Sequence, residues 1–172
     1  MISHRELYNR AKPICIQYGV NPGHLVSIMI RESLAYRDNK EYFLNNEAVG
    51  DSGKSWGLGQ IYEPTRMILN AVQADNQFYW FDIDNAIKES SRLIRDIQNK
   101  IKSDKKQVTL KRICAGYNAG QSRIYNPPES TKNHYIPYVL QKYEELYGIK
   151  KKITITLSTL VIILITYINK NK

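Results

Sequence analysis

The stretch "NPGHLVSIMIRES", residues 21–33, combines a clear helix pattern with an isolated acid near its end. Asn21 is a favoured N-cap residue and Pro22 suits the first helical position, so the pattern predicts a helix that begins here. Apolar residues recur at helical spacing, at Leu25, Val26, Met29 and Ile30. Glu32 falls near the C-terminal end, where a negative charge gains nothing from the helix dipole. It is therefore either a surface acid paired with Arg31 or a reactive group.

Helical periodicity dominates the remainder of the first 148 residues. Ser3 followed by Glu6 matches a capping box, which predicts a helix that ends at Gly19. Residues 36–60 are polar and rich in glycine, and they predict a loop with at most short strands. Apolar spacing of three and four predicts further helices at 65–73, 83–102, 110–117 and within 134–148. The sequence therefore predicts one mainly α domain over residues 1–148.

The net charge of the chain is +9, and its distribution limits the possible partners. Residues 150–172 contribute +5 of this charge, from five lysines and no acid, and residues 1–149 contribute the other +4. A mildly basic domain suits an anionic polymer such as a cell wall or nucleic acid, and an ordinary solvated surface fits the charge equally well. The most basic run, residues 100–112, lacks interleaved aromatic residues that stack on bases, which argues against nucleic-acid binding.

The cysteines and histidines point to no metal site. Cys15 and Cys114 lie in predicted helical segments, so we expect them to be buried free thiols. No pair among these cysteines and the three histidines has the spacing of zinc ligands. The sequence therefore predicts no metal site.

Residues 149–172 differ in kind from the domain that precedes them. The stretch "ITITLSTLVIILITYI", residues 153–168, contains no charge and has lysines on both sides. We expect a single transmembrane helix here, a C-terminal anchor in which residues 150–172 hold the protein to lipid. The alternative is a β-strand, because isoleucine and threonine dominate, yet the rest of the chain offers it no clear sheet. The N-terminus has no continuous apolar run, so no signal peptide is expected.

Four short motifs occur in series along the domain. They are "RES" at 31–33, "GDSGKSWGLGQI" at 50–61, "AGYNAG" at 115–120 and "NHYIPYV" at 133–139. Each alone also fits an ordinary structural role, as a surface acid, a glycine loop, a helix end or a core tyrosine. In this order they resemble soluble-type lytic transglycosylases and goose-type lysozymes, which belong to the lysozyme-like superfamily. "GLGQ" is similar to the family's "GLMQ", with Gly59 in place of methionine, and "GYNAG" is similar to "AYNAG".

The resemblance covers roughly residues 8–147 and implies a lysozyme-like α+β domain that acts on peptidoglycan without a cofactor. Such an enzyme cuts the β-1,4 bond between MurNAc and GlcNAc. Glu32 would protonate the glycosidic oxygen and then, as a base, remove the proton of the sugar's 6-hydroxyl group, which leaves a 1,6-anhydro-muramyl end. Apolar neighbours such as Ile28, Met29 and Leu58 would raise its pKa by desolvation. The substrate-binding residues implied by the resemblance are Ser33, Gln60, Tyr117, Asn118 and Tyr135.

Asp51 leaves a second mechanism open. Ordinary glycosidases use two carboxylates, and an aspartate before "GLxQ" resembles goose-type lysozymes, in which it would help to position water. The alternative role for Asp51 is an Asx-turn in the glycine loop. Trp56 could offer the sugar-stacking face that the family's methionine supplies, or it could belong to the core. The rival functions are thus a muramidase that hydrolyses the same bond and a non-catalytic glycan-binding module.

The tail and the motifs together suggest where the protein works. A wall-cutting domain with a C-terminal anchor suits a phage that carries its own membrane, so we expect a virion-associated lysin that opens the wall locally. The alternative is a bacterial inner-membrane protein whose domain faces the wall.

Overall fold

The computed structural model describes residues 1–33, 35–39 and 41–148. The α-helices are α1 (His4–Tyr18), α2 (Pro22–Glu32), α3 (Glu63–Asn70), α4 (Gln77–Phe81), α5 (Ile83–Ser103), α6 (Leu110–Ala119) and α7 (Ile136–Tyr147). The strands are β1 (Ile2–Ser3), β2 (Tyr36–Asp38), β3 (Glu41–Leu44), β4 (Val49–Gly50), β5 (Ser55–Trp56) and β6 (Ile61–Tyr62). Short 3₁₀ turns lie at η1 (Asp51–Gly53), η2 (Ala71–Gln73) and η3 (Gln121–Arg123), and Thr131–Tyr135 forms a π-helical turn.

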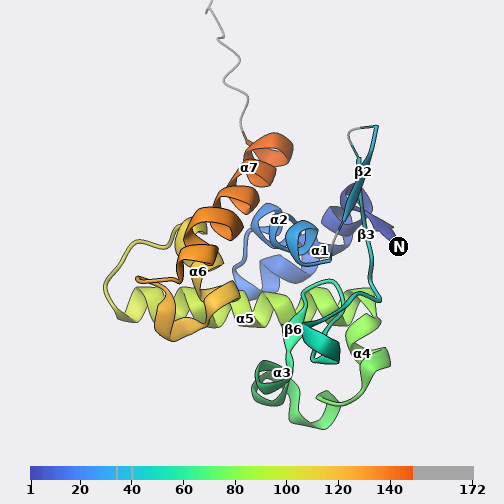
Figure 1. Cartoon of the computed structure of the whole chain (residues 1–172), viewed down its shortest axis with the longest axis horizontal. Coiled ribbons are helices and arrows are strands. Elements are labelled where there is room, and N and C mark those ends of the chain that lie inside the picture. Colours follow the sequence, from blue (N-terminus) through green and yellow to red (C-terminus); the bar gives the residue numbers. More distant parts are fainter. Residues whose placement is uncertain (34, 40, 149–172) are drawn as a thin grey trace, which may run out of the picture.

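The long helix α5 organises the molecule. Figure 1 shows α1, α2, α6 and α7 on one side of α5, and the loops and short strands β4–β6 with α3 and α4 on the other. We call this second group the small lobe. Two antiparallel three-stranded sheets are present, in the orders β1-β3-β2 and β4-β5-β6. The mainly α architecture with short strands is therefore confirmed for the described residues.

The apolar faces of the helices share one core, and the helix ends follow the sequence signals. Side chains without solvent exposure come from every core helix, among them Leu7, Leu25, Ile94, Ile113 and Val139. The Ser3 side chain accepts a hydrogen bond from the Glu6 amide at 3.3 Å, and Gly19 ends α1 with a φ of 65°. Asn21 caps α2 by accepting from the amide of Gly23 at 2.8 Å.

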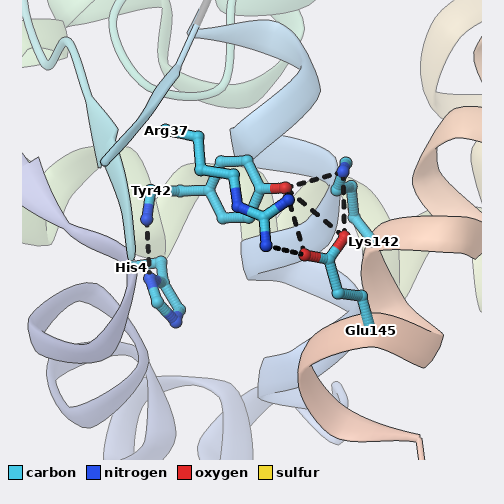
Figure 2. Close-up of polar contacts among 5 residues, drawn as sticks. All are labelled: His4, Arg37, Tyr42, Lys142 and Glu145. Carbon is cyan, nitrogen blue, oxygen red and sulfur yellow. Dashed lines mark hydrogen bonds and ion pairs between the residues drawn. The ribbon is translucent and has the colours of Figure 1, made fainter. Parts of the chain in front are cut away.

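A buried polar network ties the β2–β3 hairpin to α7 (Figure 2). Lys142, which is 8% exposed, donates to the Tyr42 hydroxyl at 2.7 Å and lies 3.0 Å from the Glu145 carboxylate. Arg37 pairs with the same carboxylate at 3.1 Å, and His4 accepts from the Tyr42 amide at 3.0 Å. Burial lowers the pKa of His4, so its unprotonated Nδ1 can accept this bond. The network holds α7 against the β2–β3 hairpin, and Tyr135 directly precedes this helix.

The predicted transmembrane helix is the part of the fold class that is wrong. Within residues 1–33, 35–39 and 41–148, no helix is both long and apolar enough to cross a membrane. The longest of them, α5, has 21 residues, but one of its faces is charged. Residues 149–172, on which the anchor was predicted, lie outside the described residues. The single-pass anchor is therefore not supported, and the expected location in a virion membrane or a bacterial inner membrane is withdrawn with it.

Candidate active site

A cavity of about 310 Å³ opens between the helices and the small lobe. Its walls hold five of the six residues singled out by sequence as catalytic or substrate-binding, together with the possible second acid, Asp51. These wall residues are Glu32, Asp51, Gln60, Tyr117, Asn118 and Tyr135. The α2 end, the α6 end and the π-helical turn supply one wall, and the loop between β4 and β6 supplies the other. Motifs separated by up to a hundred residues thus meet around one space.

Glu32 is the half-buried last residue of α2, and its carboxyl group faces this cavity. Desolvation by the surrounding protein raises the pKa of Glu32 to about 7. The hydrogen bond from Tyr135 and the charge of Arg31 act in the opposite direction, and the negative charge of Asp51 raises the value further. Burial outweighs both lowering effects. The carboxyl group is therefore about half protonated at neutral pH.

Tyr135 holds the acid in position. Its side chain is 5% exposed, and its hydroxyl group donates to Oε1 of Glu32. Tyr135 ends the π-helical turn that precedes α7, a distortion that often occurs at functional sites. Because a donor occupies Oε1, the acidic proton of Glu32 belongs on Oε2. Tyr135 thus orients the carboxyl group as well as opposing its rise in pKa.

Gln60 stabilises the opposite wall of the cavity, which is formed by the loop between β4 and β6. It is a non-glycine residue in the left-handed region, with a φ of 45°. Its amide nitrogen donates to the carbonyl oxygens of Ala48 at 2.8 Å and Gly57 at 3.0 Å. Gly50 leaves room for the other side of this amide, because a Cβ there would lie 2.2 Å from the Gln60 oxygen. Gln60 therefore lines the cavity and stabilises the loop that forms it.

The glycine at position 59 has a local cause. A Cβ on Gly59 would lie 2.3 Å from Oγ of Ser90 and 2.8 Å from the Tyr117 hydroxyl. That hydroxyl lies 2.9 Å from the Gly59 carbonyl oxygen and 3.2 Å from Ser90. Burial raises the pKa of Tyr117, so the hydroxyl stays protonated and able to donate. The methionine of the resembled family has no space here, because Tyr117 and Ser90 occupy it.

Asn118 joins the helical wall to the turn that carries Tyr135. Its side-chain oxygen accepts a hydrogen bond from the Thr131 hydroxyl at 2.6 Å. Thr131 is buried and begins the π-helical turn. Asn118 therefore fixes the turn in addition to lining the cavity.

Asp51 shares the cavity with Glu32, but its surroundings are different. It is exposed, has a φ of 49°, and accepts a hydrogen bond from the Ser55 hydroxyl. This bond suits a turn-stabilising role, and the position in the cavity wall suits a role toward substrate. Two carboxyl groups in different environments thus face one space.

Two residues singled out from the sequence, Ser33 and Trp56, lie outside the cavity lining. Ser33 is fully buried and donates to the Met29 carbonyl oxygen at 2.7 Å, one turn earlier in the chain, and it does not line the cavity. Trp56 donates to the Gly53 carbonyl at 2.7 Å, and its ring lies 3.7 Å below the Arg66 guanidinium. Arg66 is 2% exposed and also binds the carbonyl oxygens of Ile61 and Ala74, so it is the internal support of the small lobe.

Several wall residues were missed by sequence reasoning. Arg31 lines the cavity from α2, with its guanidinium 5.5 Å from the centre of the Tyr138 ring. Tyr62, Thr65 and Leu93 complete the far wall. Tyr62 and Thr65 follow the "GLGQ" motif closely enough to have been suspected. Leu93 lies in α5, about thirty residues further on, and carries no signal beyond helical amphipathicity.

Neither cysteine takes part in the site, and both are buried free thiols as expected. The described part of the chain contains no group of three or more histidine, cysteine, aspartate or glutamate residues arranged to hold a metal ion.

Comparison of the chain with known proteins found no matching family model, no matching curated protein and no matching solved structure. The likeness to lytic transglycosylases therefore rests on the four motifs and on the positions of their residues around the cavity.

Proposed function

We propose that the chain is a peptidoglycan lytic transglycosylase that cleaves the β-1,4 bond between MurNAc and GlcNAc. The observation that carries this proposal is Glu32, a desolvated carboxyl group in a cavity wall, with a pKa raised to about 7 and a fixed orientation. A general acid is most effective when its pKa lies close to the working pH.

In the proposed first step, Oε2 of Glu32 gives its proton to the glycosidic oxygen, and the bond from that oxygen to C1 of MurNAc breaks. The N-acetyl group of the substrate stabilises the oxocarbenium ion that forms. The carboxylate left on Glu32 is now a base, with Tyr135 still donating to Oε1. It removes the proton of the MurNAc 6-hydroxyl group, whose oxygen attacks C1. Glu32 is protonated again, and the product ends in a 1,6-anhydro sugar.

The second candidate is hydrolysis of the same bond by two carboxylates. Asp51 favours it, because it lies in the same cavity wall and its charge acts on Glu32. In that mechanism Asp51 helps to place a water molecule, and the product carries a free reducing end. We prefer the single-acid mechanism because Asp51 already accepts a hydrogen bond from Ser55 in an exposed turn.

Mass analysis of the muropeptides released from purified peptidoglycan tests the proposal. The 1,6-anhydro product is lighter than the hydrolysed product by one water. We expect anhydro ends from the wild-type chain and no release by Glu32→Gln, whose amide has no acidic proton. Hydrated ends would favour the muramidase. Equal release by both proteins would show that Glu32 does not carry the reaction, and release by neither would leave only the non-catalytic glycan-binding module.

A further inference from the structure

A second cavity, of about 640 Å³, continues from the first. Both cavities are lined by Tyr62, Thr65, Leu93, Tyr117 and Asn118. A polymer that lies across Glu32 therefore reaches the second cavity without leaving the surface of the protein. The two cavities differ in the chemistry of the residues that they do not share.

The walls of the second cavity include four aliphatic side chains, those of Ile68, Leu69, Leu93 and Ala119, beside polar residues such as Gln121. Ile68 and Leu69 come from α3, and Ala119 ends α6. Ile68 is 84% exposed, so its side chain is accessible to a ligand in this cavity. Sugars bind proteins through dense hydrogen bonding and contacts with aromatic faces. Among the described lining residues, Tyr62 and Tyr117 are the aromatic ones, and they already belong to the first cavity.

Asp96 is the charged residue of this lining in the described part of the chain. It lies one turn after Leu93 on α5, so both side chains are on the same face. Asp96 forms an ion pair with Arg95, with 3.3 Å between Nη2 and Oδ1. The Arg95 guanidinium, however, lies 5.3 Å from the centre of the Tyr18 ring, on α1. Such an exposed ion pair between adjacent residues is weak, and Asp96 keeps a carboxylate oxygen for another cation.

We propose that the second cavity binds the peptide branch of the glycan strand, and that Asp96 receives the side-chain amine of a diamino acid in that branch. A long alkyl chain that ends in an ammonium group matches aliphatic walls with one carboxylate. The branch is attached to MurNAc, the sugar whose bond is cut, so it begins next to the first cavity. The inference rests on the proposed function for the identity of the strand, whereas the amine site itself can be tested without cleavage.

The first test measures binding of a free tripeptide with a C-terminal lysine, which contains no glycosidic bond. The wild-type chain should bind it, and Asp96→Asn should weaken binding about fivefold, in keeping with a partly exposed ion pair. Acetylation of the lysine amine should weaken binding by the wild type to the same extent. Asp75→Asn is the matched control, because Asp75 is also exposed and lines neither cavity.

The second test compares kcat/KM on glycan strands that carry the peptide with kcat/KM on strands from which an amidase has removed it. Asp96→Asn and Ile68→Ser should lower kcat/KM on the peptide-bearing strands and leave it unchanged on the bare strands. Val72→Ser, at an 89% exposed site outside both cavities, should change neither value.

The outcomes separate this inference from the proposed function. Cleavage of both strands at equal rates, together with tripeptide binding that is indifferent to Asp96, overturns the inference alone. If no strand is cleaved but the tripeptide binds through Asp96, the proposed function fails and the amine site stands. If no strand is cleaved and the tripeptide does not bind through Asp96, both the inference and the proposed function fail.

Discussion

The two walls of the catalytic cavity are built in opposite ways. The helical wall places Glu32 and Tyr135 against a closely packed apolar core, where desolvation sets the chemistry. The small-lobe wall is an irregular loop in which Asp51, Ser52 and Gln60 all have positive φ. Its shape depends on hydrogen bonds from Gln60 and Arg66 to backbone carbonyls. Changes in the helical wall should therefore alter the reaction, whereas changes in the loop should alter binding and stability.

The largest effect is expected from Glu32→Gln. Glutamine can accept the hydrogen bond from Tyr135 but cannot donate an acidic proton. Loss of a general acid lowers kcat by about two to four orders of magnitude. Release of soluble muropeptides measures this effect, with Glu47→Gln, an exposed site outside the cavity, as the control. Retention of more than a tenth of the activity would show that another group supplies the proton.

Tyr135→Phe tests the support of the acid. The hydrogen bond from Tyr135 lowers the pKa of Glu32, so its removal should raise that pKa above about 7. The alkaline limb of the pH–rate profile should move to higher pH, while kcat falls about tenfold because the carboxyl group loses its orientation.

Tyr138→Phe is the matched control, because Tyr138 lies in the first turn of α7, three residues after Tyr135, and packs under Arg31 rather than against Glu32. An alkaline limb that stays in place in Tyr135→Phe would contradict the orienting role.

Asp51→Asn compares the loop wall with the helical wall directly. The single-acid mechanism predicts that at least a tenth of kcat/KM remains and that the product is still the anhydro sugar. The pKa of Glu32 should fall slightly, because Asp51 raises it. A decrease as deep as that of Glu32→Gln would instead support a hydrolase with two carboxylates.

Gly59→Ala should affect stability more than chemistry. The new Cβ would meet Ser90 and Tyr117, so we expect a loss of about 1–3 kcal/mol in the free energy of unfolding. Denaturant unfolding measures the change. Ser90→Ala in the same chain should recover part of the loss, because it removes the nearer of the two atoms. If the losses in the free energy of unfolding of the two single variants simply add in the double variant, the new Cβ is not crowded by Ser90.

The sequence predicted the helical wall better than the loop wall. Caps at Ser3 and Asn21 and the apolar spacing of α2 are local signals, and the structure follows them. The helix α4 was missed because "QFYWF" is too short to show a period. The left-handed backbone of Gln60 and the buried support by Arg66 depend on partners up to twelve residues away in the sequence, which come within hydrogen-bond distance only in the folded loop.

The site residues show the same division. The motifs led to Glu32, Tyr117 and Tyr135, which meet in one cavity. They also pointed to Ser33, whose hydroxyl group is taken by the backbone of its own helix. Ser90 could not be found by sequence, because a serine on an amphipathic helix gives no sign of the residue that it will meet.

The central claim is that the fold keeps Glu32 protonated near neutral pH, and a direct titration of its side chain tests this. Carboxyl carbon chemical shifts in glutamate-labelled protein, recorded from pH 3 to 9 with Glu32→Gln to identify the signal, give the pKa. We predict a midpoint at about 7, with the proton lost and the acid step failing as the pH rises through that value. A midpoint near 4.5, the ordinary value, would mean that Glu32 is ionised at neutral pH and would contradict its role as the general acid.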